Sequence, residues 1–291
     1  MPPPSTLTPG PRHPEASVLL LTVDAMRADH MKTHGYARSV TPRLDAWARR
    51  AVVFERGYCQ VPHTSFSLTS LMTGEYIYSA TRAGAGRHHR TVAATVRRYG
   101  VKTAAFFPPA VFYIDRHKFT PFESAHFDFE YVKYQFASAA ERVDQAIAFL
   151  QNLGARQRFF VWAHFFEAHE PYERHQGFDF GPRAVDRYDG ELAYVDHHLG
   201  RLLDHVSRHH PDTIVALTAD HGEEFGEHGA HYHGNALYDQ QVRVPLVIAL
   251  PGGRGRRVQG PAQVIDLPAT ILGLLDIPRT AGMRGTDLGP W

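Results

Sequence analysis

The sequence has a single cysteine, no long apolar run and almost no net charge, and each of these shortages excludes a class of protein. Because Cys59 is alone among 291 residues, no intrachain disulfide can form and the fold does not depend on an oxidising compartment. No apolar run approaches the roughly 20 residues of a transmembrane helix. A formal net charge of +1 gives no strong field toward nucleic acid or an anionic membrane. We therefore expect a soluble chain without a membrane span or a nucleic-acid partner.

The amino terminus also lacks the basic and apolar segments of a signal peptide, so the sequence leaves the cellular location open. Residues 1–15 contain six prolines and few apolar residues, which predicts a flexible tail or a linker. We expect residues 16–291 to form one folded domain.

Strand-like and helix-like segments alternate along the rest of the chain. Apolar runs of strand length predict strands at residues 17–23, 52–54, 101–107, 158–163, 212–218 and 244–250. Apolar residues at helical spacing, or capping signals, predict helices that start at Thr41 and cover residues 64–74, 90–99, 137–153, 185–209 and 267–275. This alternation predicts an α/β fold, with a wound and mostly parallel sheet that has helices on both faces.

Residues 108–135 are rich in Pro, Phe, Tyr and His but have no clear periodicity, which predicts a long loop that could form a lid over a site. The aromatic residues of the wider segment 106–136 could face a lipid or an aryl group, or could simply pack within the loop.

Side chains that can bind a divalent cation follow two of the predicted strands. Asp24 follows the run 17–23, and Asp220 and His221 follow the run 212–218. In open α/β sheets, ligands bind at the carboxyl ends of the strands, where these side chains would meet. Aspartate and neutral histidine suit Zn²⁺ or Mn²⁺. The pair Asp220-His221 taken alone fits an ordinary turn with a surface histidine equally well.

Thr64 is the candidate nucleophile, at the start of the predicted helix 64–74. As a further ligand of the same cation, its hydroxyl would have a lowered pKa and could react at neutral pH. The helix start would also present N–H groups to an anionic transferring group. The alternative role of Thr64 is an ordinary helix cap. Cys59 has no identifiable base, and we expect it to be a small apolar filler.

Six segments in this order resemble motifs of the sulfatase branch of the alkaline phosphatase superfamily, over nearly all of residues 17–290. They are Val23–Asp29 (first metal motif), Thr41–Asp45, Thr64–Gly74 (nucleophile helix), Asp220–Gly222 (second metal motif), Tyr238 with Val242–Leu246, and Asp266–Thr270 (closing helix).

The sequence also departs from the sulfatase pattern. Sulfatases carry Cys-x-Pro-Ser-Arg, whose Cys or Ser becomes formylglycine, and Thr64 occupies that position and cannot be converted. His221 stands where many sulfatases have Asn, and Phe106–Pro109 replace a Gly-Lys-Trp-His segment. These substitutions resemble the threonine-nucleophile members of the superfamily, which are phosphoethanolamine transferases, glycerol-phosphate transferases and phosphodiesterases.

The resemblance implies an enzyme with one or two divalent ions, Zn²⁺ or Mn²⁺ rather than Ca²⁺. The implied ligands of the nucleophile-activating ion are Asp24, Thr64, Asp220 and His221. The implied groups that face the phosphoryl group or a second ion are His164, His169 and His233, and His233 is chosen because it lies twelve residues after His221. The implied catalytic residues are Thr64, His169 and His233. Asp196 matches a recurrent family position and is expected to be structural.

The reaction implied is transfer or hydrolysis of a small-molecule or lipid-linked phosphate ester through a covalent Thr64 intermediate. The chain would then be a catalytic domain, which in such transferases is often anchored to a membrane. Two alternatives stay open: a sulfuric ester hydrolase without formylglycine, and a non-catalytic metal-binding domain on the same fold. The sequence leaves the substrate and the oligomeric state undetermined.

Overall fold

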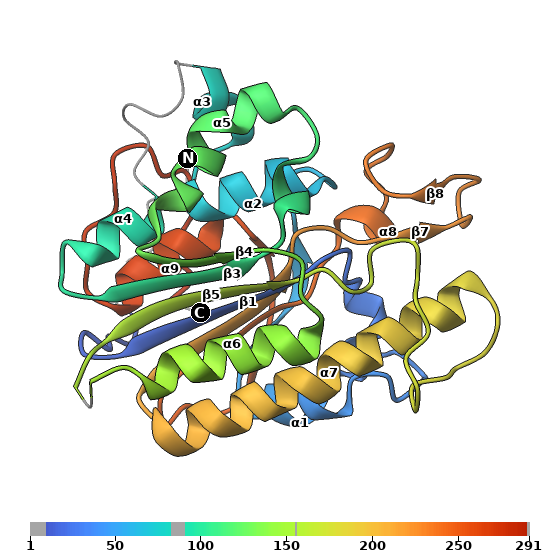
Figure 1. Cartoon of the computed structure of the whole chain (residues 1–291), viewed down its shortest axis with the longest axis horizontal. Coiled ribbons are helices and arrows are strands. Elements are labelled where there is room, and N and C mark those ends of the chain that lie inside the picture. The colour runs from blue at the N-terminus through green and yellow to red at the C-terminus, as the bar shows by residue number, and fades with distance from the viewer. Residues whose placement is uncertain (1–9, 83–90, 155, 290–291) are drawn as a thin grey trace.

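An eight-stranded sheet lies at the centre of the molecule, with helices on both of its faces (Figure 1). The computed structural model describes residues 10–82, 91–154 and 156–289, so residues 1–9 of the expected tail lie outside the described residues. The strand order is β10-β2-β9-β6-β1-β5-β3-β4, and β7 and β8 form a separate two-stranded sheet.

The strands are β1 (Ser17–Val23), β2 (Val52–Tyr58), β3 (Lys102–Phe107), β4 (Tyr131–Tyr134), β5 (Phe159–Phe165), β6 (Thr213–Ala219), β7 (Glu224–Phe225), β8 (His231–Tyr232), β9 (Leu246–Ala249) and β10 (Arg256–Gln263). The α-helices are α1 (Pro42–Ala48), α2 (Thr64–Thr73), α3 (Ile77–Arg82), α4 (Val92–Arg97), α5 (Arg116–Ser124), α6 (Ala139–Gln151), α7 (Ala184–His209), α8 (Asp239–Val242) and α9 (Asp266–Leu274). Short 3₁₀ turns are η1 (Ala28–His30), η2 (Lys32–His34), η3 (Pro109–Phe112) and η4 (His126–Asp128).

The pairing of the strands confirms the predicted α/β class. β1 lies between β5 and β6 and is parallel to both, and β3 is parallel to β5. β9 runs antiparallel to its neighbours β2 and β6. β5 and β6 are buried along their whole length, as expected for strands that are covered on both faces. The parallel strands therefore bring their carboxyl ends to one edge of the sheet.

Two groups of helices cover the sheet (Figure 1). α1, α6 and α7 pack on one face, with α7 in contact with both α1 and α6. α2, α4 and α9 lie on the other face and contact one another. The helix predicted at residues 64–74 is present as α2, and Gly74 ends it with a left-handed φ of 70°.

The prediction of a long loop at residues 108–135 is wrong. This stretch contains η3, α5, η4 and the edge strand β4. Several of its aromatic side chains form a buried cluster, namely Phe112, Phe119, Phe122, Phe127 and Phe129. Their burial depends on contacts with α2 and β3 rather than on a local repeat, so no periodicity marks the segment.

Asp196 holds the start of α1 against α7, in agreement with its expected structural role. Its buried carboxylate accepts hydrogen bonds from the backbone N–H groups of Arg43 (3.0 Å) and Leu44 (2.7 Å). In Asp196→Ala both donors lose this partner, so we expect the free energy of unfolding to fall by about 2 kcal/mol in a denaturant titration.

Asp204→Ala is the matched control for Asp196→Ala, because Asp204 also lies on α7 and pairs with the side chain of Arg43. Its carboxylate is 59% exposed. The change in unfolding free energy should therefore stay below about 1 kcal/mol. Equal losses in the two variants would contradict the capping role of Asp196.

Among the described residues, none of the helices is both long enough and apolar enough to cross a membrane.

Candidate functional site

The predicted metal ligands lie together at the carboxyl edge of the sheet. Asp24 directly follows β1, and Asp220 and His221 directly follow β6, the parallel neighbour of β1. All three side chains are fully buried. Thr64, the first residue of α2, reaches the same place from another element, because its hydroxyl lies 3.1 Å from His221 Nε2. The structure thus brings all four residues together.

Thr64 does not act as the cap of its helix. The cap position of α2 is occupied by His63, and the Thr64 hydroxyl points to His221 instead. Cys59, the other side chain considered as a nucleophile, is buried, and burial raises the pKa of its thiol. A protonated, inaccessible thiol fits the expected role as an apolar filler.

The glycine after His221 is required by close packing at this point. A Cβ atom at Gly222 would lie 2.1 Å from the backbone oxygen of Gln240. The Gly222 N–H also donates to the backbone oxygen of Gln241 at 2.8 Å. The Asp-His-Gly segment is therefore held directly against the chain before β9, which fixes where the side chains of the two candidate ligands point.

The atoms that converge in this group fit a divalent cation. Candidate ligand atoms of Asp24, Asp220 and His221 all lie within 4.8 Å of one another. Both oxygens of Asp24 and Oδ2 of Asp220 are buried without a hydrogen-bond partner. His221 Nδ1 lies 3.0 Å from the Gly222 carbonyl, to which it donates, so its Nε2 lone pair faces the carboxylates. Buried unpaired carboxylate oxygens beside an imidazole nitrogen form a donor set that suits a divalent cation.

The electrostatics of the group also favour a bound cation. Burial raises the pKa of Asp220 well above its usual range, and the neighbouring charge of Asp24 raises it further. For Asp24 itself, burial acts in the same direction, but the imidazoles of His164, His169 and His221 outweigh it and lower the pKa. Burial lowers the pKa of His221, which keeps the ring neutral and able to bind a metal. Two adjacent buried carboxylates repel each other unless a positive charge lies between them.

A second group of possible ligands adjoins the first group, which is Asp24, Asp220 and His221. The second group is half-buried. Candidate ligand atoms of His169, Glu170 and His233 lie within 4.8 Å of one another. The ring of His233 lies between the groups, with its centroid 4.0 Å from that of His221 and 5.2 Å from that of His169. The predicted pair His169 and His233 is therefore brought together beside His221, with Glu170 as an additional carboxylate.

Glu223 orients His233. The buried carboxylate of Glu223 accepts from His233 Nδ1 at 3.0 Å and from the Tyr172 hydroxyl at 2.8 Å. Burial acts to lower the pKa of His233, but the hydrogen bond to Glu223 outweighs it and raises the pKa. With Nδ1 committed to Glu223, the Nε2 side of the ring is the one available to a substrate or an ion.

His164 is placed differently from the other two predicted histidines. It is fully buried, with Nε2 3.4 Å from Asp24 Oδ2 and Nδ1 2.9 Å from the Thr22 hydroxyl. Burial lowers the pKa of His164, so the ring is neutral. It lies against the buried side of the first group, whereas His169 and His233 form the half-buried group.

Sequence reasoning missed two residues of this arrangement, Glu170 and Glu223. Each is the direct neighbour of a predicted motif, since Glu170 follows His169 and Glu223 follows Asp220-His221-Gly222. An acidic residue next to a candidate ligand is the only signal that could have found them, and it does not specify which way the carboxylate points.

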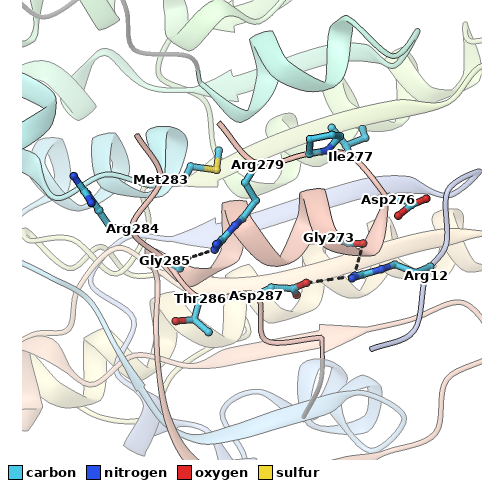
Figure 2. A pocket seen from close by; sticks show the side chains of 11 residues that line it. Arg12, Gly273, Asp276, Ile277, Arg279, Met283, Arg284, Gly285, Thr286 and Asp287 are labelled. Carbon is cyan, nitrogen blue, oxygen red and sulfur yellow. Dashed lines mark hydrogen bonds and ion pairs between the residues drawn. The ribbon is translucent and has the colours of Figure 1, made fainter. Parts of the chain in front are cut away.

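A surface depression of about 650 Å³ near both ends of the described chain contains none of these candidate residues (Figure 2). Two of its three arginines make contacts within the chain: Arg12 donates to the Gly273 carbonyl and pairs with Asp287, and Arg279 donates to the Gly285 carbonyl. These contacts tie the segments around residues 12 and 287 to α9.

Comparison with known proteins decides the family. A family model described as Sulfatase matches residues 16–277. The chain belongs to the sulfatase family. It is 35% identical over 96 residues to the uncharacterized sulfatase YidJ of Escherichia coli, covering 33% of this chain and 19% of that protein. It is 30% identical over 123 residues to choline-sulfatase of Rhizobium meliloti, covering 40% of this chain and 23% of that protein. The aligned segments thus span about a fifth of these relatives.

Solved structures of other enzymes share the fold of this sulfatase-family chain. Phosphonate monoester hydrolase of Agrobacterium radiobacter superposes with a TM-score of 0.80 at 20% identity, covering 94% of this chain and 76% of that chain. The soluble domain of lipooligosaccharide phosphoethanolamine transferase A from Neisseria meningitidis superposes with a TM-score of 0.69 at 18% identity, covering 94% and 92%. The predicted fold and family are therefore confirmed.

Proposed function

We propose that this chain transfers or hydrolyses phosphate esters through a covalent intermediate on Thr64, with one or two divalent cations. The observation that carries the proposal is the position of the Thr64 hydroxyl, 3.1 Å from His221 Nε2 and beside two buried carboxylates. A hydroxyl at this position needs no conversion to formylglycine in order to act as a nucleophile. On this proposal residues 16–291 form the catalytic domain.

Asp24, Asp220 and His221 would hold the first cation, with the Thr64 oxygen as a further ligand. Such a cation lowers the pKa of a hydroxyl and neutralises charge on a phosphoryl group. Zn²⁺ and Mn²⁺ suit two carboxylates and an imidazole better than Ca²⁺, which prefers more oxygen ligands.

In the first step Thr64 Oγ1 gives its proton to the solvent and forms a bond to phosphorus, while the bond between phosphorus and the leaving alcohol oxygen breaks. The leaving oxygen takes up a proton from the solvent. In the second step water, or a second alcohol, attacks the phosphorus and releases Thr64 with its proton restored. Water as acceptor makes the reaction a hydrolysis, and an alcohol makes it a transfer.

His169 and His233 are proposed to contact the nonbridging oxygens of the phosphoryl group or to hold a second cation. Both rings lie beside the first group, and Glu223 fixes the orientation of His233. The first turn of α2 adds backbone N–H groups next to Thr64. Stabilisation of developing negative charge by such fixed groups is usually the largest catalytic contribution.

Hydrolysis of sulfate esters is the second candidate, because YidJ and choline-sulfatase are both described as sulfatases. We expect kcat/KM for an aryl phosphate ester to exceed that for the matching aryl sulfate by at least about tenfold, since the site offers cations and imidazoles to a more highly charged group. Initial rates with the two esters, measured with Zn²⁺ and with Mn²⁺, test this. A preference for the sulfate would favour the second candidate, and no turnover of either would favour a non-catalytic metal-binding domain.

A further inference from the structure

The segment between β5 and α7, residues 166–183, presents part of the candidate site. It runs from the end of β5 past β7 to the start of α7 (Figure 1). It carries His169 and Glu170 of the half-buried group. The structure describes all of its residues and places no helix or strand among them, so regular backbone structure does not fix where these two side chains point. Contacts with the rest of the molecule must therefore hold them.

Glu167 holds the beginning of the segment against α6. Its carboxylate accepts a hydrogen bond from the backbone N–H of Ala139, the first residue of α6, where it also faces the positive end of the helix dipole. Ala168, the next residue, has a left-handed φ of 78°. A residue other than glycine keeps this conformation only where its surroundings hold it. The chain that leads into His169 is therefore fixed on its upstream side.

Glu191 holds the downstream side of the segment against α7. Its side chain lies in the middle of that helix and is buried. Oε1 accepts from the backbone N–H of Glu173 at 2.6 Å, and Oε2 accepts from His175 Nε2 at 2.6 Å. The His175 ring also lies flat against Tyr194 of α7, with centroids 3.8 Å apart. Within the described part of the chain, all hydrogen bonds of the Glu191 carboxylate go to this segment.

The contact between His175 and Glu191 is a charge-assisted hydrogen bond. The bond to Glu191 raises the pKa of His175, and this effect outweighs burial, which acts to lower the pKa. A hydrogen bond between an imidazolium and a carboxylate is roughly twice as strong as one between neutral groups. A buried carboxylate that loses such a partner is left without compensation for its lost hydration. Glu191 therefore strongly favours the state in which the segment is bound to α7.

Tyr172 extends this attachment to the second histidine of the half-buried group. It directly precedes Glu173, and its hydroxyl donates to Glu223 at 2.8 Å. Glu223 is the carboxylate that orients His233. The attachment of the segment to α7 therefore acts on His169 through the backbone and on His233 through Glu223.

We propose that Glu191 and His175 are positioning residues, which hold the segment so that the half-buried group faces the transferring phosphoryl group. This inference rests on the proposed function and adds residues that touch neither the substrate nor an ion. Glu167 fixes only the beginning of the segment, so without Glu191 the chain after Glu170 could move and the two histidines would lose their common orientation. Accurate placement of the groups that contact a reacting centre accounts for a large part of catalysis.

The test measures, by isothermal titration calorimetry, the affinity of the metal-loaded protein for orthovanadate, which stands in for the phosphoryl group. His175→Phe keeps a ring that can stack on Tyr194 but removes the hydrogen bond, and Glu191→Gln keeps the side-chain volume but removes the charge. We expect each variant to raise Kd about tenfold, as is usual when a group that orients others from outside a site is lost. The double variant should have a Kd close to that of the single variants, because both changes break one contact. A role in folding alone would leave Kd unchanged well below the unfolding midpoint.

His209→Phe is the matched control, because it makes the same change at an exposed histidine in the last turn of α7. It should leave Kd within about twofold of the wild type. If the wild type binds orthovanadate and His175→Phe and Glu191→Gln bind it equally well, the inference is overturned while the proposed function stands. Additive losses in the double variant would also overturn it, because they would show two separate effects. Absence of binding in the wild type would instead contradict the proposed function, and this inference with it.

Discussion

Thr64→Ala is expected to lower kcat for phosphate esters by at least about a thousandfold while the protein stays folded, because the bond to phosphorus then has no acceptor atom on the protein. The side chain is half-buried at the start of α2 and its hydroxyl contacts His221, so the substitution empties no fully buried position. Circular dichroism and the unfolding midpoint check the fold, and single-turnover kinetics with an aryl phosphate check the chemistry.

Thr64→Ser is the matched control, because it keeps the hydroxyl and removes one methyl group. It should keep kcat within about tenfold of the wild type, since the reacting group is retained. Wild-type turnover in Thr64→Ala would remove the nucleophile assignment. Equal losses in the alanine and serine variants would show that the position matters for packing rather than for its oxygen.

Asp220→Asn is expected to raise the stability of the metal-free protein and to lower that of the metal-bound protein. In metal-free protein at neutral pH the variant should be more stable than the wild type, because the wild-type carboxyl must take up a proton on folding in order to lie buried beside Asp24, and an amide does not. With saturating Zn²⁺ or Mn²⁺ the order should reverse. A metal ion at 100 times its Kd adds about 2.7 kcal/mol to the free energy of unfolding of the wild type. The variant should bind the ion more weakly, because it lacks the negative charge of one coordinating side chain.

The stability of the metal-free wild type should fall as the pH rises. Burial and Asp24 raise the pKa of Asp220 in the folded state above its unfolded value. Its contribution to stability is therefore present at low pH and is lost as the pH rises from about 4 through the folded pKa. Metal-free wild type should show this loss and Asp220→Asn should not.

Asp212→Asn is the control for Asp220→Asn, because Asp212 is an exposed carboxylate at the other end of β6. It should leave the thermal midpoint unchanged with and without metal. Differential scanning fluorimetry and metal analysis after gel filtration measure both effects. Wild-type metal content in Asp220→Asn would contradict the assignment of Asp220 as a ligand.

The sequence predicted the buried part of the sheet well and its edges poorly. The central strands β1, β5 and β6 are covered on both faces, so they are continuous apolar runs. β4 and β10 are the two edge strands, and sequence reasoning missed both. β10 is mostly exposed and contains a glycine, a proline and an irregular register, so no apolar pattern marks it.

The same physical difference separates the site residues that could be predicted from those that could not. Asp24, Asp220 and His221 directly follow buried strands, so their meeting at one edge follows from the topology. The position of Glu223 depends on hydrogen bonds to His233 and Tyr172. Such contacts between distant segments depend on how loops pack, and the order of residues alone does not contain them.

The intact mass of metal-loaded protein, quenched during turnover of activated phosphate mono- and diesters, tests the central claim most directly. We predict a mass increase equal to the transferred phosphoryl or alkylphosphoryl group, located on Thr64 by peptide mapping and absent from Thr64→Ala. Turnover with no adduct at any quench time, or an adduct on another residue that persists in Thr64→Ala, would contradict a covalent Thr64 intermediate.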